Sequence, residues 1–255
     1  MPKFFPRSPW PVAFPAVIIH GALRARNAHP SYMSAKSGDA DAARVLVETL
    51  LSQDETERLD HLLAGRQPIL LPITADEVAG FNAIPDAMAQ SLALRLGLSV
   101  AAGKILQANK VGHTKADGWH RLVTPAKFIG DVIAGADYIL VDDHVGFGGT
   151  FANLRGFIEH NGGKVLAMTA LTETREARQI AVRNQTLNML YEKHGSELAD
   201  FWNREFGHGL DCLTNIEGEY LCRVESVAAI KTRMAQAAEL ACSRGLSPVS
   251  LGSGP

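Results

Sequence analysis

Apolar runs alternate with segments of helical spacing through the middle of the chain. Three runs are apolar throughout or nearly so: residues 68–73, 138–141 and 164–171. Segments with apolar residues on one helical face separate them: residues 85–95, 125–134 and 151–160. A parallel strand is covered on both faces, so a continuous apolar run suits it. Shorter strand candidates are residues 98–100 and 104–107. This alternation predicts a parallel sheet with right-handed crossovers, and hence an α/β core over residues 67–172.

Residues 1–66 are predicted to form a partly helical N-terminal extension. Its start is rich in proline, Val17–Ile19 suits an edge strand, and Arg24–Pro30 is expected to be a loop. Helical spacing follows in two segments: residues 42–51 and 55–63. Asp39 or Asp41 is the expected N-cap of the first. Four residues of this extension could approach a phosphate, although a solvated loop and helix start is the favoured interpretation: Arg24, Arg26, Tyr32 and Lys36.

The pattern changes after Thr174. Helical spacing continues in three segments, interrupted at glycines: residues 175–194, 196–206 and 215–241. We therefore predict a helical C-terminal region over residues 173–244, which would pack as a cap over the cleft or as a dimer surface. Residues 245–255, rich in Gly, Ser and Pro, are predicted to be a flexible tail.

The most informative stretch follows the apolar run 138–141. Asp142 and Asp143 come first, and a glycine-rich turn then leads through Gly148 and Gly149 to Thr150, which opens the helical segment 151–160. Loop amides and a helix N-terminus suit an anion, and glycines let the backbone approach it. The carboxylates would accept hydrogen bonds from vicinal sugar hydroxyls or face a hydrated Mg²⁺. The stretch therefore predicts a site for a ribose 5-phosphate unit. The alternative is a glycine-rich turn with a solvated acidic pair.

Two common phosphate-binding motifs do not fit this loop. A Walker A loop has Lys before its final Thr, where this chain has Gly149. The dinucleotide-binding fingerprint requires a third Gly where Phe151 stands, and it lacks the two adjacent aspartates. A monophosphate beside a sugar is the interpretation that uses both halves of the stretch.

Val141–Asp143 and Gly148–Thr150 resemble the signature of the type I phosphoribosyltransferases. The resemblance implies an α/β fold: a parallel-sheet type I phosphoribosyltransferase-like core with helices on both faces, here with an α-helical C-terminal extension. It also implies binding of phosphoribosyl pyrophosphate, Mg²⁺ as cofactor, a homodimer and a role in nucleotide metabolism. His144 and Phe147 depart from the signature, which usually has an aliphatic residue and a Thr there. Gly146 stands where purine-salvage members carry an Asp proposed as general base.

The resemblance assigns roles to residues along the chain. Asp142 and Asp143 would hold the ribose hydroxyls, oppose positive charge on the ribose and face Mg²⁺. The phosphate-binding loop would comprise His144, Val145, Gly146, Phe147, Gly148, Gly149 and Thr150. Thr74 and Ala75 would begin the pyrophosphate loop, residues 74–82. Residues 108–121 would form a mobile lid over the reacting centre, with basic or proton-carrying candidates at Lys110, His113, Lys115 and Arg121. A solvated surface loop is the alternative for residues 108–121.

Composition narrows the class of protein. The chain has 255 residues, 46% of them hydrophobic, and a formal net charge of −2, which does not suggest a general nucleic-acid binder. Three cysteines fit neither a zinc pair nor a disulfide framework, so we expect reduced thiols and a cytoplasmic protein. We expect no membrane span, because no apolar run reaches about 18 residues. We also expect no signal peptide, because the N-terminus lacks an apolar core segment.

Three functions are compatible with these features. The first is transfer of 5-phosphoribosyl from phosphoribosyl pyrophosphate to a nitrogen acceptor resembling a nucleobase, with release of pyrophosphate. A pyrimidine or orotate-like acceptor, whose nitrogen is already acidic, would not need the carboxylate absent at Gly146. The second is a non-catalytic sensor of phosphoribosyl pyrophosphate or a nucleotide, with the C-terminal helices binding a partner. The third is a hydrolase of ribosyl phosphates.

Overall fold

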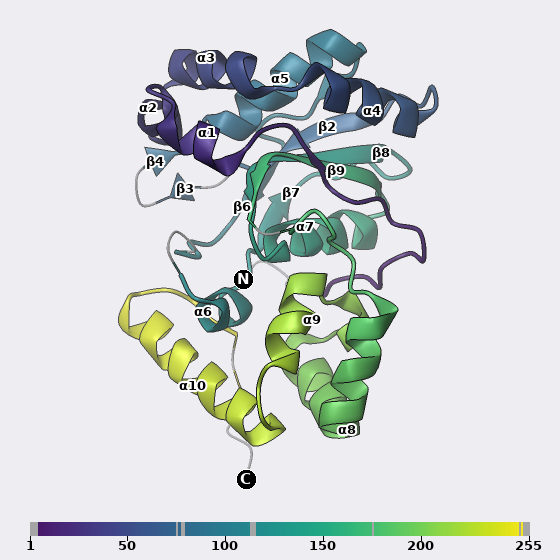
Figure 1. The fold of residues 1–255 in the computed structure, drawn as a ribbon, viewed down its shortest axis with the longest axis vertical. Helices are drawn as coiled ribbons and strands as arrows, with labels where there is room; N and C mark the ends of the chain where they lie inside the picture. Colours follow the sequence, from purple (N-terminus) through teal and green to yellow (C-terminus); the bar gives the residue numbers. More distant parts are fainter. Residues whose placement is uncertain are drawn as a thin grey trace.

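The computed structural model describes residues 5–74, 76, 77, 80–112, 116–174, 176–249 and 251 (Figure 1). A five-stranded parallel sheet forms its core, in the strand order β1-β9-β8-β2-β5. Its strands are β1 (Ile18–Ile19), β2 (Ile69–Pro72), β5 (Ser99–Val100), β8 (Asp137–Val145) and β9 (Lys164–Glu173). The predicted parallel sheet is therefore confirmed, and Val17–Ile19 supplies an edge strand, as expected.

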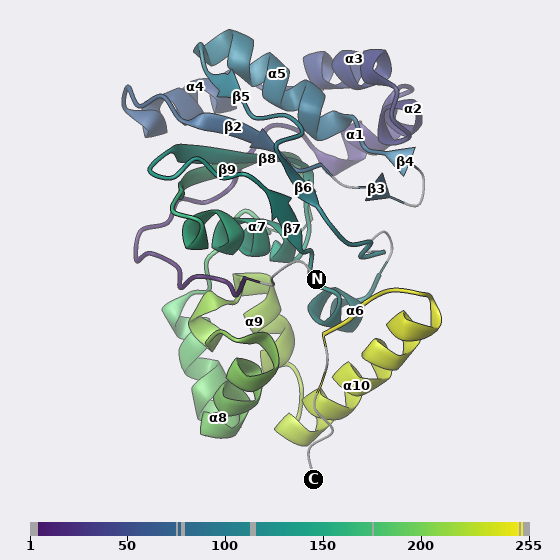
Figure 2. The same ribbon diagram turned by 180° about the vertical axis from the view of Figure 1, so that it is seen from behind.

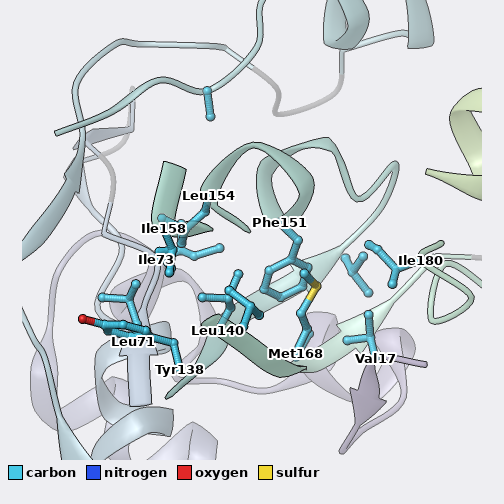
Figure 3. Packing of buried hydrophobic residues seen from close by; sticks show 14 of the residues in the cluster. Val17, Leu71, Ile73, Tyr138, Leu140, Phe151, Leu154, Ile158, Met168 and Ile180 are labelled. Atoms are coloured by element: carbon cyan, nitrogen blue, oxygen red, sulfur yellow. The ribbon is translucent and has the colours of Figure 1, made fainter. Parts of the chain in front are cut away.

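Side chains of the central strand β8 alternate between two apolar cores. Leu140 packs in a cluster with Phe151 and Leu154 of α7 (Gly149–His160) on one face of the sheet (Figure 3). Ile139 and Val141 pack in a second cluster on the other face. That face is covered by α3 (Ala40–Leu50), α4 (Gln53–Leu63) and α5 (Ile84–Leu96). Burial on both faces explains why the run 138–141 shows no alternation in sequence.

Two helices of the N-terminal extension lie near one end of the sheet: α1 (Leu23–Ala28) and α2 (Tyr32–Lys36). The prediction of a loop over Arg24–Pro30 was wrong, because α1 occupies most of it. The reason is that Arg26 is the buried residue of α1, and N-cap Ala22 makes no side-chain cap. Neither apolar periodicity nor a capping residue therefore marks this helix in the sequence. Asp39 caps α3 by accepting from the Ala42 N–H, as one of the two expected candidates.

The predicted helix over residues 125–134 was also wrong. Residues Phe128–Gly130 form β7, which pairs antiparallel with β6 (Ile105–Gln107) in a separate hairpin. Phe128 is buried at the start of β7, whereas Ile129 and Gly130 are exposed. Gly130 has φ +131°, and a Cβ there would lie 2.1 Å from the Lys104 carbonyl oxygen. The chain therefore crosses β6 too closely for any other residue at that position.

Short elements surround the hairpin. The strands β3 (Asp76–Glu77) and β4 (Gly80–Phe81) pair antiparallel in the predicted pyrophosphate loop. The predicted lid ends in a short helix, α6 (Gly118–Val123), which Asp117 caps.

The C-terminal helices build a third core below the sheet (Figures 1 and 2). They are α8 (Asn184–Phe206), the 3-10 turn Leu210–Cys212, α9 (Asn215–Cys222) and α10 (Val227–Ser243). The predicted break at Gly195 is present as a non-helical residue inside α8, whereas the helix begins at Asn184 and not at residue 175. Helix α6 joins this core through Leu122 and Val123.

The described part of the predicted tail is packed and not free. Val249 donates its N–H to the Val123 carbonyl (2.7 Å), and Val249 and Leu251 lie against the third core. Burial of these apolar side chains holds the segment despite its Gly, Ser and Pro content. In the part of the chain that the structure describes, no helix is both long and apolar enough to span a membrane.

Candidate functional site

A cavity of about 620 Å³ opens where the parallel strands β8 and β2 end. Most of its lining comes from the end of β8 with the loop into α7, the helices α1 and α2, the lid segment with α6, and the end of α10. Single residues from the end of β2, from β6 and from α9 also line it. In an open α/β sheet, this crevice is where ligands bind. The site is therefore assembled from segments that span most of the sequence.

The acidic pair lies within β8, which continues to Val145 and so extends past the four predicted residues. Asp143 is buried, and its Oδ2 lies 3.1 Å from Lys36 Nζ and 3.7 Å from Arg26 Nη1. Asp142 Oδ1 accepts the Asp143 backbone N–H at 2.8 Å. Two cations from the N-terminal helices thus surround one carboxylate of the pair.

These surroundings divide the charge unequally between the two carboxyls. Burial and then the negative charge of Asp143 raise the pKa of Asp142 well above its ordinary value. Burial acts in the same direction on Asp143, but the positive charges of Lys36 and Arg26 outweigh it, and the pKa of Asp143 is lowered. The negative charge of the pair therefore resides mainly on Asp143.

The loop into α7 has the form of an anion site. Its N-cap Gly148 has φ +78° and provides no capping side chain, so no cap satisfies the first amides of α7. A Cβ at Gly148 would lie 2.5 Å from Ile180 Cδ1. A Cβ at Gly149 would lie 2.9 Å from Glu217 Oε1. The loop is thus packed closely against the C-terminal region, and the positive φ of Gly148 independently favours glycine there.

Phe147 fastens this loop to the C-terminal helices. Its carbonyl accepts a hydrogen bond from Thr214 Oγ1 (2.6 Å), and its ring meets the Tyr220 ring edge-on, with 5.4 Å between centroids. The Arg121 guanidinium lies 5.8 Å from the centre of the Phe147 ring. Phe147, one of the residues that depart from the signature, thus joins the loop to α6 and α9.

His144 is part of the cavity wall. Its Nδ1 lies 2.9 Å from Thr172 Oγ1 and its Nε2 lies 2.8 Å from Thr174 Oγ1. Two threonine hydroxyls thus hold the two ring nitrogens. Burial, followed by the positive charge of Arg26, lowers the pKa of His144 to about 4, so the ring is neutral at pH 7.

The predicted lid contributes two of its four candidates to the cavity. Lys110 and Arg121 both line it. Arg121 Nε donates to the Ala116 carbonyl (3.2 Å), and burial lowers the pKa of the guanidinium. A Cβ at Gly146 would lie 3.7 Å from Arg121 Nη1, so this cation is beside the phosphate-binding loop. His113, Lys115 and Ala75 lie outside the described residues.

Thr74 is described but is not among the residues that line the cavity. Its carbonyl accepts the Gln107 N–H (3.0 Å), which ties the end of β2 to β6. Its neighbour Ile73 lines the cavity, as does Asn82 at the far end of the predicted pyrophosphate loop.

Several cavity residues were missed or underrated at the sequence level. Arg26, Tyr32 and Lys36 line the cavity although a solvated position was favoured, while Arg24 is exposed and does not. Their only signal was a basic, aromatic-containing segment without apolar periodicity. Glu217 and Arg244 also line the cavity, from α9 and from the end of α10. Nothing in their local sequence indicated this position.

The contacts of Asp142 and Asp143 do not suit a role as direct metal ligands. Among the described residues, no group of three or more His, Cys, Asp or Glu side chains is arranged to hold a metal ion. Lys36 and Arg26 already neutralise Asp143, and Asp142 is the carboxyl with the raised pKa. Direct coordination of Mg²⁺ by both carboxylates does not fit this arrangement, since Mg²⁺ prefers ionised oxygen ligands without competing cations.

Comparisons with known proteins found relatives by sequence and similar solved structures. No protein-family model matches the chain. The chain is 44% identical over 238 residues to protein TraN of Escherichia coli, a match that covers 93% of this chain and 53% of TraN. It is 40% identical over 152 residues to an uncharacterized protein of Haemophilus influenzae, covering 60% of this chain and 34% of that protein. The chain thus spans about half the length of the first relative and a third of the second.

Solved structures similar to the chain include phosphoribosyltransferases. Adenine phosphoribosyltransferase from Thermoanaerobacter pseudethanolicus matches with a TM-score of 0.31 and 24% identity, over 53% of this chain and 70% of that one. The enzyme of the same name from Saccharomyces cerevisiae matches with a TM-score of 0.33 and 16% identity, over 51% and 74%. UMP synthase from Leishmania donovani matches with a TM-score of 0.29 and 12% identity, over 75% and 35%.

Proposed function

We propose that this chain binds phosphoribosyl pyrophosphate and transfers its 5-phosphoribosyl group to a nitrogen acceptor, releasing pyrophosphate. One observation carries the proposal. The acidic pair and the glycine loop, adjacent in sequence, line one cavity together with basic side chains from the lid and from the N- and C-terminal regions. The acidic pair would suit the sugar hydroxyls, the glycine loop would suit the 5-phosphate, and the basic side chains would suit the pyrophosphate.

The 5-phosphate would lie on the amides of Gly146–Thr150 and on the N-terminus of α7. The ribose hydroxyls would meet Asp142 and Asp143, and Asp143, whose pKa is lowered by Lys36 and Arg26, would be the stronger acceptor. The pyrophosphate would extend toward Lys110 and Arg121. Anchoring both ends of the ligand would fix its C1 atom, so that remote binding energy serves orientation.

Bond breaking at C1 builds positive charge on the ribose and negative charge on the pyrophosphate. Asp143 would oppose the first charge, and the two basic side chains would oppose the second. His144 would not carry the acceptor's proton at neutral pH, because its pKa is about 4 and two threonines hold both ring nitrogens. Gly146 supplies no carboxylate either. The proposal therefore favours a nucleobase-like acceptor whose nitrogen is already acidic.

A second candidate is a non-catalytic sensor of the same ligand. The contacts of Phe147 with Thr214 and Tyr220 favour it, because they connect the phosphate-binding loop directly to the C-terminal helices. A ligand that moved this loop would act on α9 without any chemistry.

The test combines calorimetry with a pyrophosphate-release assay over a panel of nucleobases. Asp143→Asn, which removes the carboxylate that carries most of the pair's negative charge, should abolish saturable binding or reduce turnover at least ~100-fold. Asp137→Asn, at the opposite end of the same strand, is the matched control and should behave like the wild type. Binding with base-dependent release supports the transferase, and binding without release supports the sensor. Release without any base indicates a hydrolase, and no binding by folded wild type contradicts all three.

A further inference from the structure

Two cations of the N-terminal helices lie against the acidic pair. Lys36, the last residue of α2, and Arg26 of α1 both approach the same oxygen of Asp143, at 3.1 and 3.7 Å. The exposed fractions of the three side chains are 17% for Lys36 and 8% each for Arg26 and Asp143. Arg26 also stacks on Tyr32, with its guanidinium 4.7 Å from the ring centre. These cations are therefore built into the wall and are not surface charges that happen to lie nearby.

The residues that line the cavity include more basic side chains than carboxyls. Five basic side chains line the cavity: Arg26, Lys36, Lys110, Arg121 and Arg244. The carboxyls that line it are Asp142, Asp143 and Glu217. Glu217 is already matched by Arg7, through two hydrogen bonds of 2.5 and 2.9 Å. The described wall thus offers net positive charge to a polyanionic ligand without an added ion.

A divalent cation on Asp143 would meet strong repulsion. Mg²⁺ bound about 2.1 Å from the carboxylate oxygen would come within roughly 5 Å of Lys36 Nζ, since that nitrogen lies 3.1 Å from the same oxygen. Like charges at that separation in a partly buried site cost several kcal/mol or expel one partner. The ammonium and the ion therefore compete for one place.

We propose that Lys36, assisted by Arg26, occupies at Asp143 the place of a divalent cation, so that the chain binds phosphoribosyl pyrophosphate without Mg²⁺. The inference rests on the proposed function, because it concerns the same ligand and the same cavity. Lys36 and Arg26 provide the positive charge beside the ribose, and the lid cations and Arg244 provide it at the pyrophosphate.

The test is calorimetric titration of the full chain with phosphoribosyl pyrophosphate, once in EDTA and once in millimolar MgCl₂. The wild-type dissociation constants should agree within threefold. Lys36→Met should bind at least tenfold more weakly in EDTA, and Mg²⁺ should recover most of this loss by entering the vacated place. Lys36→Arg should keep the metal-independent binding. Arg24→Met, a change of an exposed cation on the same helix as Arg26 and outside the cavity, should match the wild type.

The outcomes separate this inference from the proposed function. Wild-type binding that requires Mg²⁺ overturns the inference and leaves the proposed function standing. The same holds if Lys36→Met loses binding that Mg²⁺ does not recover, since Lys36 would then contact the ligand only as an anion-binding residue. Absence of wild-type binding in both buffers contradicts the proposed function itself. If Lys36→Met does not fold, the wild-type ratio and Lys36→Arg decide the question.

Discussion

The buried ion pair between Arg7 and Glu217 gives the sharpest test of how this site is held together. Arg7 donates to both oxygens of Glu217 and, through Nε, to Asn153 Oδ1 of α7 at 2.7 Å. The side chains of the pair are 8% and 1% exposed. Replacing Arg7 with Met keeps much of the volume and leaves the Glu217 carboxylate buried without its cation, directly beside Gly149 of the phosphate-binding loop.

The expected loss is large for a single substitution. Removing one partner of a buried ion pair costs about 3–5 kcal/mol, because an uncompensated charge stays in a poorly solvated place. In a chain of 255 residues, each kcal/mol lowers Tm by about 2–4 °C. Arg7→Met should therefore lower the melting temperature by about 6–20 °C.

The assay is urea unfolding followed by circular dichroism for Arg7→Met, Glu217→Gln and the double variant. Glu217→Gln retains an oxygen that can accept the Thr214 N–H, the bond that completes the capping box of α9. The double variant should recover at least ~1 kcal/mol relative to the sum of the single losses. Arg178→Met, which breaks the more exposed pair with Glu173, is the control and should cost at most ~1 kcal/mol. An Arg7→Met loss no larger than that of Arg178→Met, or strict additivity in the double variant, would refute the reasoning.

Three further predictions concern the same structure. Thr214→Val should lose about 2–3 kcal/mol in thermal melts, because it removes the N-cap of α9 and leaves the Phe147 carbonyl without its hydroxyl donor, whereas Thr214→Ser should lose no more than half of that. Arg244→Met should weaken calorimetric binding of phosphoribosyl pyrophosphate about tenfold, while Arg233→Met, on the same helix but outside the cavity, should not. Burial lowers the pKa of three histidines to about 4: His20, His144 and His208. The unfolded chain then binds more protons below about pH 6.5, so the free energy of unfolding should fall as pH drops from 6.5 toward 4, by up to about 1.4 kcal/mol per histidine and pH unit, and Tm should fall with it. A flat profile over that range would contradict the burial of these rings.

Local patterns in the sequence predicted the parts of the fold that burial controls. Continuous apolar runs marked β2, β8 and β9, because both faces of these strands are covered. The same reasoning failed at residues 125–134, where apolar residues follow a helical spacing but the chain forms a hairpin strand that Gly130 makes possible, and Ile129 and Ile133 are exposed. Local spacing cannot distinguish these cases, since the deciding contact is with Lys104, outside the segment.

The sequence predicted the part of the candidate site that is contiguous in the chain, but not the residues that come from distant segments. Asp142–Thr150 is one motif, and the motif alone indicated a sugar-phosphate site. Arg26 and Lys36 reach Asp143 across more than a hundred residues, and a basic segment in sequence is usually a solvated face. Arg244 follows a helix whose apolar face packs elsewhere, so its position depends on tertiary structure alone.

The placement of Arg244–Leu246 in the cavity wall has a consequence for the order of events during synthesis. The acidic pair and the phosphate-binding loop leave the ribosome about a hundred residues before this turn does, yet the turn forms one wall of the same cavity. Strand β1 likewise waits for β9, its partner in the sheet, for about 150 residues. Pairings this distant in sequence slow folding, because the chain must close long loops before contacts stabilise it. A nascent chain therefore carries an unpaired sheet edge until β9 is made, and the cavity stays open on one side until the turn after α10 is made.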